Sequence, residues 1–193
     1  FDHSFELEEI LFAKGKAAAL ETVRGMIHEA GTVAYGRQQE RAGLGHAVWC
    51  ARHLIHDEPV AVLLADDLIL GSSCLAEMLA SYQGGNMVAV MDVPKFETGS
   101  YGIITPGSDD GRLVEVSGLV EKPDPANAPS NIGVVGRYII EAGVFAQLDT
   151  QDRGAGNEVQ LTDALARQIG KAPFHGFRFS GERFDCGSKI GFL

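Results

Sequence analysis

An apolar run that ends in two adjacent aspartates limits the folds open to this chain. The sequence VLLADDLIL, from Val62 to Leu70, holds Asp66 and Asp67 within an otherwise apolar stretch. The preceding residues, 59–65, are apolar on both faces, which is typical of a strand buried in a parallel sheet. Burying an unpaired charge costs several kcal/mol. The aspartates are therefore expected at the carboxyl end of that strand, where open α/β sheets collect their ligands.

Helices and strands alternate around this run. Apolar residues recur at helical spacing in the first 30 residues, which predicts one or two helices, and again from Gly43 to Ile55, which predicts a helix with glycines at its start. A short strand is expected from Thr32 to Tyr35, a helix from Cys74 to Tyr82 and a buried strand from Met87 to Val93. This order is typical of βαβ units.

From Tyr101 onward the pattern changes to strands with few helices. Turn signals at Pro106-Gly107 and Asp110-Gly111 separate the first two expected strands. The expected elements are strands at 101–105, 112–121, 132–140 and 174–179, and helices at 141–148 and 158–168. The fold class is therefore predicted to be α/β, with residues 1–193 forming a single three-layer domain on a mixed sheet.

The composition excludes several classes of function. The chain has 193 residues, 45% of them hydrophobic, which is enough for a substantial core. Sixteen basic and 26 acidic residues give a formal charge of -10, which argues against a surface that follows nucleic-acid phosphates. Three widely separated cysteines indicate neither a disulfide framework nor a zinc site. No segment has the ~18 apolar residues that a membrane helix needs, so a cytoplasmic protein without membrane or nucleic-acid partners is expected.

Two pairs of neighbouring charged residues lie in or beside predicted strands, where side chains alternate between the two faces. Consecutive side chains of a strand point to opposite faces, so Asp66 and Asp67 are not expected to hold one ion together. One should bind a ligand or metal while the other caps or faces solvent. Alternatively both merely end the strand, with Asp67 or Ser72 capping the next element. Glu121 and Lys122, in the sequence VEKP, are likewise expected to face opposite ways.

The sequence GLGHA, from Gly43 to Ala47, precedes a predicted helix. Gly43 and Gly45 would let backbone N–H groups approach a phosphate or a base at the helix N-terminus. GxG without a third glycine is a weak signal, and a simple loop is the alternative. His46 has no Ser or Cys partner at a motif spacing, so a structural role is expected for it.

Taken in chain order, eight short motifs resemble those of the bacterial UTP:glucose-1-phosphate uridylyltransferases. VEKP and DCG are shared with other sugar-1-phosphate nucleotidylyltransferases, whereas GLGHA together with QLTDA favours the uridylyl branch. The motifs are SFELE at 4–8, GRQ with GLGHA at 36–47, LLADD at 63–67, YGII at 101–104, LVEKPDP at 119–125, IGVVGRYI at 132–139, NEVQLTDAL at 157–165 and FDCGSKIGF at 184–192.

The resemblance implies a Rossmann-like, three-layer nucleotidyltransferase fold with a mixed, mostly parallel central sheet. It also implies uridylyl transfer from UTP to glucose 1-phosphate, which gives UDP-glucose and pyrophosphate. An oxygen of the sugar phosphate would attack the α-phosphorus in line with the departing pyrophosphate. Because this oxygen is already ionised near neutral pH, catalysis would depend on aligning the two substrates and offsetting their negative charge. Mg²⁺ is the expected cofactor, and a homo-oligomer, a dimer or tetramer, is expected. The family's GxGTRxxPxTK loop and C-terminal helices have no counterpart here, so an incomplete enzyme is expected.

The resemblance also implies site residues, matched position by position. Asp66, Lys122 and Asp185 are the expected catalytic residues, and Asp66 and Asp185 would hold the metal. The implied substrate contacts are Gln38 and Gly43 for the nucleotide, and Gly102, Glu121, Lys122, Gly136 and, more weakly, Lys189 for the sugar phosphate.

Three alternatives stay open. A sister nucleotidylyltransferase would use dTTP, ATP or GTP, because a side-chain amide such as that of Gln38 can read several bases. A non-catalytic sugar-phosphate-binding module would fit a chain without the phosphate loop. A glycosyltransferase with a DxD-like metal site is disfavoured by the presence of VEKP and FDCG together.

Overall fold

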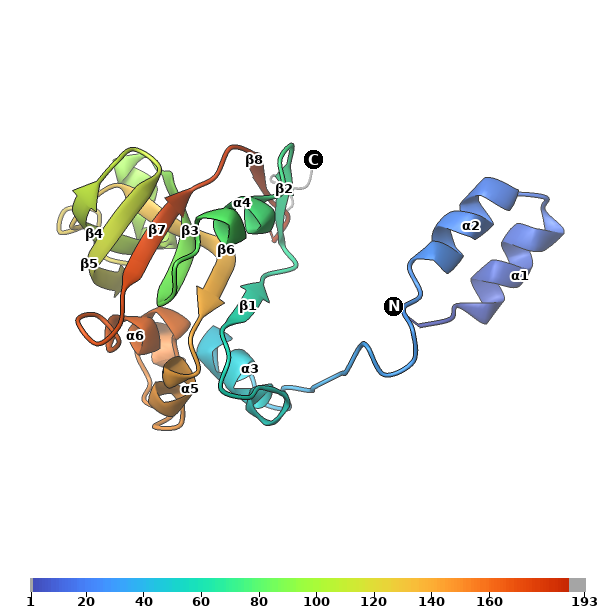
Figure 1. Cartoon of the computed structure of the whole chain (residues 1–193), viewed down its shortest axis with the longest axis horizontal. Coiled ribbons are helices and arrows are strands. Elements are labelled where there is room, and N and C mark those ends of the chain that lie inside the picture. The colour runs from blue at the N-terminus through green and yellow to red at the C-terminus, as the bar shows by residue number, and fades with distance from the viewer. Residues whose placement is uncertain (1, 188–193) are drawn as a thin grey trace. The chain divides into compact units, whose positions relative to one another are not determined.

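The computed structural model describes residues 2–187, which divide into two compact units on either side of the Arg37–Gln38 bond (Figure 1). The smaller unit is a hairpin of helices α1 (Phe5–Ala13) and α2 (Ala17–Gly25). The larger unit, which begins at Gln38, holds the sheets and the remaining helices. Among the described residues, no helix is both long and apolar enough to span a membrane.

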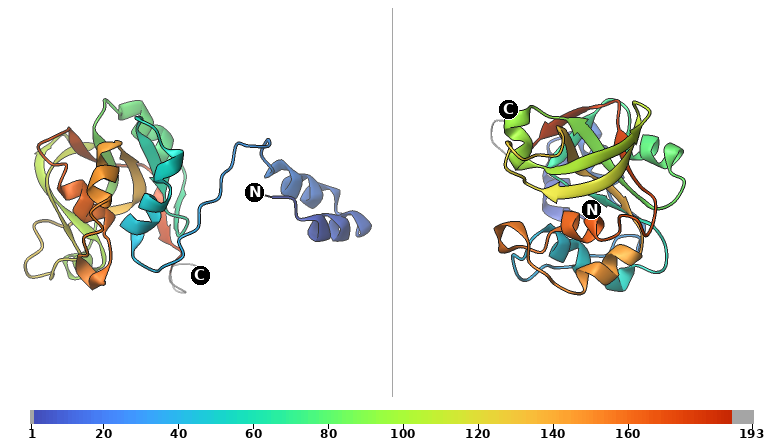
Figure 2. Two further views of the ribbon diagram at one scale, coloured as in Figure 1. Left: turned by 90° about the horizontal axis from the view of Figure 1, so that it is seen from below. Right: turned by 90° about the vertical axis from the view of Figure 1, so that its left-hand side faces the viewer.

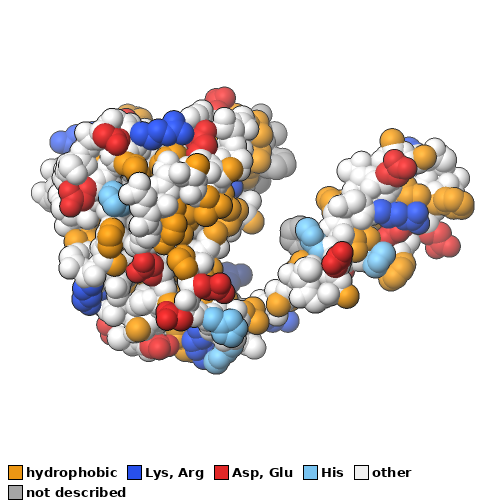
Figure 3. Space-filling model, in the orientation of Figure 1, with side chains coloured by type: hydrophobic (Ala, Val, Ile, Leu, Met, Phe, Trp, Pro, Cys, Tyr) orange, Lys and Arg blue, Asp and Glu red, His pale blue; other side chains and the backbone are white. Residues whose placement is uncertain are grey.

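An ion pair joins the two helices of the hairpin. Glu8 is buried and accepts a hydrogen bond from Arg24 Nε at 2.9 Å, with His3 Nδ1 3.2 Å from its other oxygen. The hydrogen bonds from Arg24 and His3 hold the pKa of Glu8 below its usual value. Phe5 and Phe12 remain 74% exposed, and hydrophobic side chains are visible on the surface of the hairpin (Figure 3). The strand expected from Thr32 to Tyr35 is wrong: these residues are exposed and pair with no strand.

The larger unit contains a six-stranded sheet in the order β1-β6-β3-β7-β5-β4 and a separate ribbon of β2 and β8. β4 also pairs with β6, through Ile103 and Gly133, so the sheet curves back on itself. The strands are β1 (Val60–Leu63), β2 (Asp67–Leu70), β3 (Asn86–Asp92), β4 (Gly102–Asp109), β5 (Leu113–Glu121), β6 (Ile132–Ile140), β7 (Phe174–Arg178) and β8 (Glu182–Asp185). The helices are α3 (Leu44–Cys50), α4 (Cys74–Ser81), α5 (Gly143–Leu148) and α6 (Leu161–Ala166), with 3₁₀ turns at Arg52–Leu54, Lys95–Ser100 and Ala155–Asn157.

Helices cover both faces of the large sheet (Figure 1, Figure 2). Alternate residues of β3 point to the two faces: Val88 and Val90 join the core that includes α3, α5 and α6, whereas Met87 and Ala89 join the core beneath α4. The N-terminus of α4 is capped by Ser73, whose hydroxyl accepts from the backbone N–H of Ala76. The three-layer α/β fold with a mixed sheet is thus confirmed.

The expectation of a mostly parallel sheet is wrong. Within residues 2–187, β3–β7 is the only parallel pairing of the large sheet, and its other pairings are antiparallel. β1 pairs antiparallel with β6 and ends the strand order, and Leu63 is 51% exposed. Among the described residues β1 therefore has one neighbouring strand, and its apolar run did not specify the direction of that neighbour.

The sequence VLLADDLIL also folds differently from the expectation of one strand that ends in acids. The chain turns at Ala65-Asp66 and a second strand, β2, begins at Asp67. β2 pairs with β8, an element that the sequence pattern did not predict. The acid pair thus lies at a turn between two strands rather than at the end of one.

Candidate active site

A cavity of about 300 Å³ opens where the β1–β2 turn, β4, β5, β6, β8 and α6 meet. Its charged lining residues are four carboxylates and two cations, an excess of two negative charges. Six of the predicted site residues line it: Asp66, Gly102, Glu121, Lys122, Gly136 and Asp185. The remaining predicted residues, Gln38 and Gly43, do not line this cavity, and Lys189 lies outside the described residues.

Asp66 and Asp185 lie next to each other although they are 119 positions apart in the chain. The backbone N–H of Cys186 donates to Asp66 O at 2.7 Å. A methyl group placed on Gly187 would lie 3.1 Å from Asp185 Oδ1 and 3.2 Å from Asp66 Oδ2, so the two carboxylates face the same small space. Within residues 2–187, no three His, Cys, Asp or Glu side chains form a metal-binding group. Two carboxylates alone fit Mg²⁺, which usually keeps several waters and takes its other ligands from substrate phosphates.

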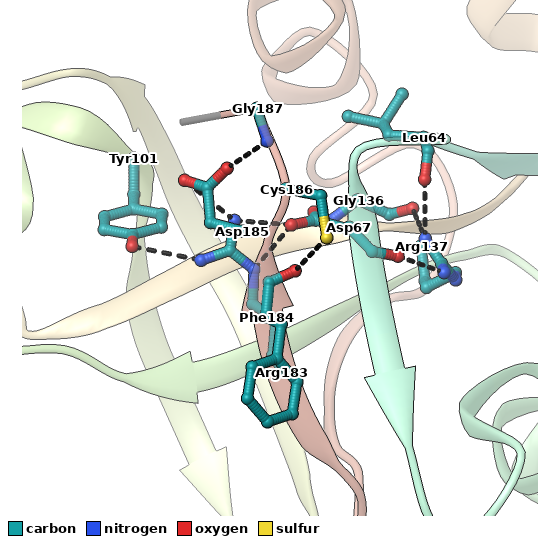
Figure 4. Close-up of polar contacts among 10 residues, drawn as sticks. All are labelled: Leu64, Asp67, Tyr101, Gly136, Arg137, Arg183, Phe184, Asp185, Cys186 and Gly187. Atoms are coloured by element: carbon teal, nitrogen blue, oxygen red, sulfur yellow. Dashed lines mark hydrogen bonds and ion pairs between the residues drawn. The ribbon is translucent and has the colours of Figure 1, made fainter. Parts of the chain in front are cut away.

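The sequence suggested that one of the two aspartates caps the following element or faces solvent. Asp67 does neither. Its side chain is 6% exposed, and its Oδ2 accepts from the backbone N–H of Gly136 at 2.5 Å (Figure 4). Its Oδ1 accepts from Arg183, with Nε at 2.6 Å and Nη2 at 2.5 Å. Asp67 is therefore a buried carboxylate whose charge is offset by two guanidinium nitrogens that contact one of its oxygens.

Arg183 is a residue of this site that sequence reasoning missed. It lines the cavity, and its Nη1 donates to the hydroxyl of Tyr101 at 3.1 Å. Burial alone would lower the pKa of Arg183, but the charge and hydrogen bond of Asp67 raise it above its usual value. The sequence could have indicated Arg183 as a site residue, because it stands two residues before Asp185 and so lies on the same face of a strand.

A second arginine holds the turn that carries the acids. Arg137, on β6, donates from Nη1 to Leu64 O at 3.0 Å and to Gly136 O at 2.8 Å, and from Nη2 to Asp67 O at 2.5 Å. These contacts are visible beside the ribbon in Figure 4. Backbone carbonyls on both sides of Asp66 are thereby fixed to β6.

Glu121 and Lys122 both face the cavity, so the expectation that they point in opposite directions is wrong. Lys122 has a φ of 45°, which breaks the extended conformation on which that expectation depended. Lys122 Nζ lies 3.7 Å from Glu121 Oε1, and its backbone N–H donates to Tyr101 O at 3.0 Å. The left-handed residue thus brings a cation to the same side as the preceding acid.

Thr162, on α6, is the second cavity residue that the sequence reasoning missed. Its hydroxyl donates to Glu121 Oε2 at 2.8 Å, and its side chain is buried. A methyl group on Gly102 would lie 2.8 Å from Thr162 Cγ2 and 3.2 Å from Glu121 Oε2. Gly102 is therefore needed to let this acid and threonine approach the strand.

Gly136 and Tyr138, which are two residues apart on one face of β6, both line the cavity. A methyl group on Gly136 would lie 2.7 Å from Leu64 Cβ and collide with the Asp67 carboxylate, so the glycine is required by the protein itself. Burial, followed by the charges of Glu121 and Asp67, raises the pKa of Tyr138. Its phenol therefore stays protonated at neutral pH.

Gln38 and Gly43 lie together beside Leu44, which lines the cavity. Gln38 Nε2 donates to Gly43 O at 3.1 Å and lies 2.9 Å from His46 Nδ1. Gly43 has a φ of 98°, and a side chain there would meet Val159 O at 2.7 Å. These contacts fix the turn before α3 in a shape that only glycine allows without strain.

Comparisons with known proteins extend over nearly the whole chain. The profile of the family described as nucleotidyl transferase matches residues 4–189. A UTP–glucose-1-phosphate uridylyltransferase of Komagataeibacter xylinus is 50% identical over 193 residues, which cover 98% of this chain and 68% of the relative. One from Staphylococcus haemolyticus is 43% identical over 196 residues, covering 100% and 68%.

Solved structures are also similar to this chain over most of its length. A crystal structure of UDP-glucose pyrophosphorylase complexed with UDP-glucose has a TM-score of 0.86 and 38% identity, covering 93% of this chain and 69% of that one. The UTP-bound UGPase from Acinetobacter baumannii has a TM-score of 0.82 and 34% identity, covering 100% and 68%.

Proposed function

Because the chain belongs to the nucleotidyl transferase family, among the UTP–glucose-1-phosphate uridylyltransferases, we propose that it transfers the uridylyl group of UTP to glucose 1-phosphate. The products are UDP-glucose and pyrophosphate. The observation that carries this proposal is the convergence of Asp66, Asp185, Glu121 and Lys122 on one cavity. Their motifs are distant in the sequence, so their convergence supports a common task.

The proposed chemistry is in-line attack of the sugar phosphate oxygen on the α-phosphorus of UTP. This oxygen is ionised near neutral pH, so no general base is required, and the protein has to align two anions and offset their charge. Lys122 would place its ammonium near the sugar phosphate, while Glu121 accepts hydrogen bonds from glucose hydroxyls. Gly102 and Gly136 would leave room for the sugar ring.

The excess of negative charge in the cavity requires a cation if two phosphate compounds bind there. Asp66 and Asp185 would hold Mg²⁺, which would offset the charge on the phosphates and orient them. Asp67 is not a ligand in this proposal, because Gly136 and Arg183 occupy its oxygens.

We assign the nucleotide to the side of the cavity marked by Leu44. Gln38 would read the uracil edge and the backbone at Gly43 would approach the base. Gln38 already contacts Gly43 O and His46, so its amide orientation is fixed before any nucleotide arrives. Lys189 stays a weaker phosphate candidate. A cytoplasmic homo-oligomer remains our prediction, and light scattering of the purified protein checks the assembly.

A substrate panel tests the proposed function. The full-length enzyme is supplied with glucose 1-phosphate and UTP, dTTP, ATP or GTP, and released pyrophosphate is measured. UTP should be preferred, and preference for another nucleotide would replace the uridylyl assignment with a sister activity. Binding of glucose 1-phosphate without turnover on any nucleotide would favour a non-catalytic module.

Two variants test the residue roles. Asp66→Asn should lower turnover while keeping the fold, since it removes a metal ligand and preserves shape, and Asp57→Asn, an exposed position outside the cavity, serves as the matched control. Near-parental turnover of Asp66→Asn at saturating Mg²⁺ would contradict the metal role. Glu121→Ala should chiefly weaken glucose 1-phosphate binding, because it leaves sugar hydroxyls unpaired. Calorimetry that finds unchanged affinity would contradict that role.

A further inference from the structure

The ribbon of β2 and β8 carries both expected metal ligands but has little packing of its own. Each strand has four residues, and within residues 2–187 they pair only with each other. Ile69 packs against the core beneath α4, whereas Leu68 and Leu70 are 46% and 51% exposed. An isolated two-stranded ribbon is marginally stable in water, so contacts with the large sheet must hold it in place.

Asp67 and Arg183 supply such contacts from the two strands of the ribbon. In the register of the ribbon Asp67 lies opposite Asp185, and Arg183 reaches it diagonally. The pair is buried, with side chains 6% and 11% exposed. Asp67 also accepts from the backbone of Gly136 on β6, and Arg183 donates to Tyr101 just before β4. The ion pair therefore ties the ribbon to β6 and to the residue that precedes β4.

We propose that Arg183, acting through Asp67, is a positioning residue for the metal-binding carboxylates Asp66 and Asp185. Asp66 directly precedes Asp67, and Asp185 is the register partner of Asp67 and lies 3.7 Å from Arg183 Nη2 through its Oδ2. The ion pair thus fixes the backbone on both sides of the space that the two carboxylates face. This inference rests on the proposed function, which places a divalent cation there.

The contacts of Arg183 argue against direct phosphate binding. Nε and Nη2 are directed at Asp67, and Nη1 at the Tyr101 hydroxyl, so each guanidinium nitrogen has a protein partner. Lysine cannot reproduce this arrangement, because its ammonium is a point charge without the planar fork. Arg183→Lys should therefore preserve the positive charge and lose the simultaneous contacts with Asp67 and Tyr101.

The test compares Arg183→Lys with Arg178→Lys in the full-length protein. Arg178 also contacts an aspartate through two guanidinium nitrogens, with Nη1 2.9 Å from Asp109 Oδ1 and Nη2 3.0 Å from Oδ2, at a site outside the cavity. Binding of Mn²⁺ alone is measured by calorimetry, and Asp66→Asn identifies the binding that belongs to this site. Loss of a residue that orients a metal ligand typically weakens metal affinity about 10- to 100-fold. We expect a loss in that range for Arg183→Lys and no change for Arg178→Lys.

Tyr101→Phe provides a milder variant if Arg183→Lys does not fold, since it removes one contact of Arg183 and keeps the ring; it should also weaken Mn²⁺ binding. Unchanged Mn²⁺ affinity in whichever variant folds, in an enzyme that makes UDP-glucose, overturns the inference alone. Weakened Mn²⁺ binding in the variant, together with a parent protein that makes no UDP-glucose, supports the inference and overturns the proposed function. A parent protein that binds no Mn²⁺ at Asp66 overturns the inference together with the metal site.

Discussion

Replacing Thr162 with valine tests whether the protein orients Glu121, the acid proposed to bind the sugar. Valine has nearly the shape of threonine but cannot donate to Glu121 Oε2, from which the hydroxyl is 2.8 Å away. A hydrogen bond to a charged group is worth about 1.5–3 kcal/mol, and about 1.4 kcal/mol corresponds to a tenfold change in affinity. Because Lys122 still lies 3.7 Å from Oε1 and restrains the carboxylate, we expect the lower end, a loss of about tenfold.

The assay varies each substrate of the full-length enzyme in turn, with the other saturating. Thr162→Val should raise the KM for glucose 1-phosphate about tenfold, with kcat and the KM for UTP nearly unchanged, since the lost interaction contributes to ground state and transition state alike. Thr162→Ser keeps the donor and loses the methyl group beside Gly102, so it should behave like the parent. A Thr162→Val enzyme with an unchanged KM for glucose 1-phosphate would refute the reasoning. A serine variant as impaired as the valine variant would assign the effect to packing instead.

Three further changes have outcomes that the structure fixes. Gly136→Ala should destabilise the fold by about 1–3 kcal/mol in urea unfolding, because the new methyl group would lie 2.7 Å from Leu64 Cβ. An unchanged urea midpoint would show that the turn between β1 and β2 can move to accommodate the methyl group. Burial raises the pKa of Cys74 to about 11, so iodoacetamide at pH 8 should label it far more slowly than the two half-buried cysteines, as peptide mass spectrometry would show. The hydrogen bond from Arg178 holds the pKa of Asp109 below its usual value of 3.8, so this carboxylate stabilises the fold above that pH and the contribution is lost as the pH falls through the lower folded pKa. Asp109→Asn should therefore lose less stability than the parent on acidification below pH 3.8, and parallel melting curves would count against the pair.

Local pattern was sufficient where turn residues bound an element on both sides. The strand predicted at 132–140 has the bounds of β6, and the helix predicted at 74–82 differs from α4 by one residue. In both, apolar periodicity and flanking breakers point to the same element. The predicted helix at 158–168 begins too early, because residues 158–160 are extended and pack on the turn at Gly43.

Strand direction could not be read from the sequence. A continuous apolar run is compatible with a parallel neighbour on each side, but it is equally compatible with a strand such as β1, whose antiparallel partner lies about 75 residues downstream. The bend at Ala65-Asp66 had no glycine or proline to mark it. The ribbon was missed for the same reason, since β2 pairs with β8 across more than 100 residues of chain.

Thr162 and Arg183, which were missed at the site, share one property: each contacts another cavity residue that is distant in the sequence. Thr162 contacts Glu121 across 41 positions, and Arg183 contacts Asp67 across 116. A motif draws attention to residues that resemble ligand contacts, whereas the side chains that orient them become visible only when the fold brings them together. Strand alternation predicted different tasks for Asp66 and Asp67, but it did not indicate that Asp67 contacts a guanidinium far along the chain.

The segment before α6 and the motif QLTDA connect two parts of the cavity. Gly45 N donates to Val159 O at 2.8 Å and Val159 N donates to Ala42 O at 2.7 Å, so the segment forms backbone contacts with the turn assigned to the nucleotide. Three residues later, Thr162 holds the acid assigned to the sugar. Val159 and Thr162 are only three residues apart in the chain, which leaves little room for the two contacts to move independently. Any displacement of α6 would therefore change both halves of the cavity together, which suits a reaction whose rate depends on the alignment of two anions.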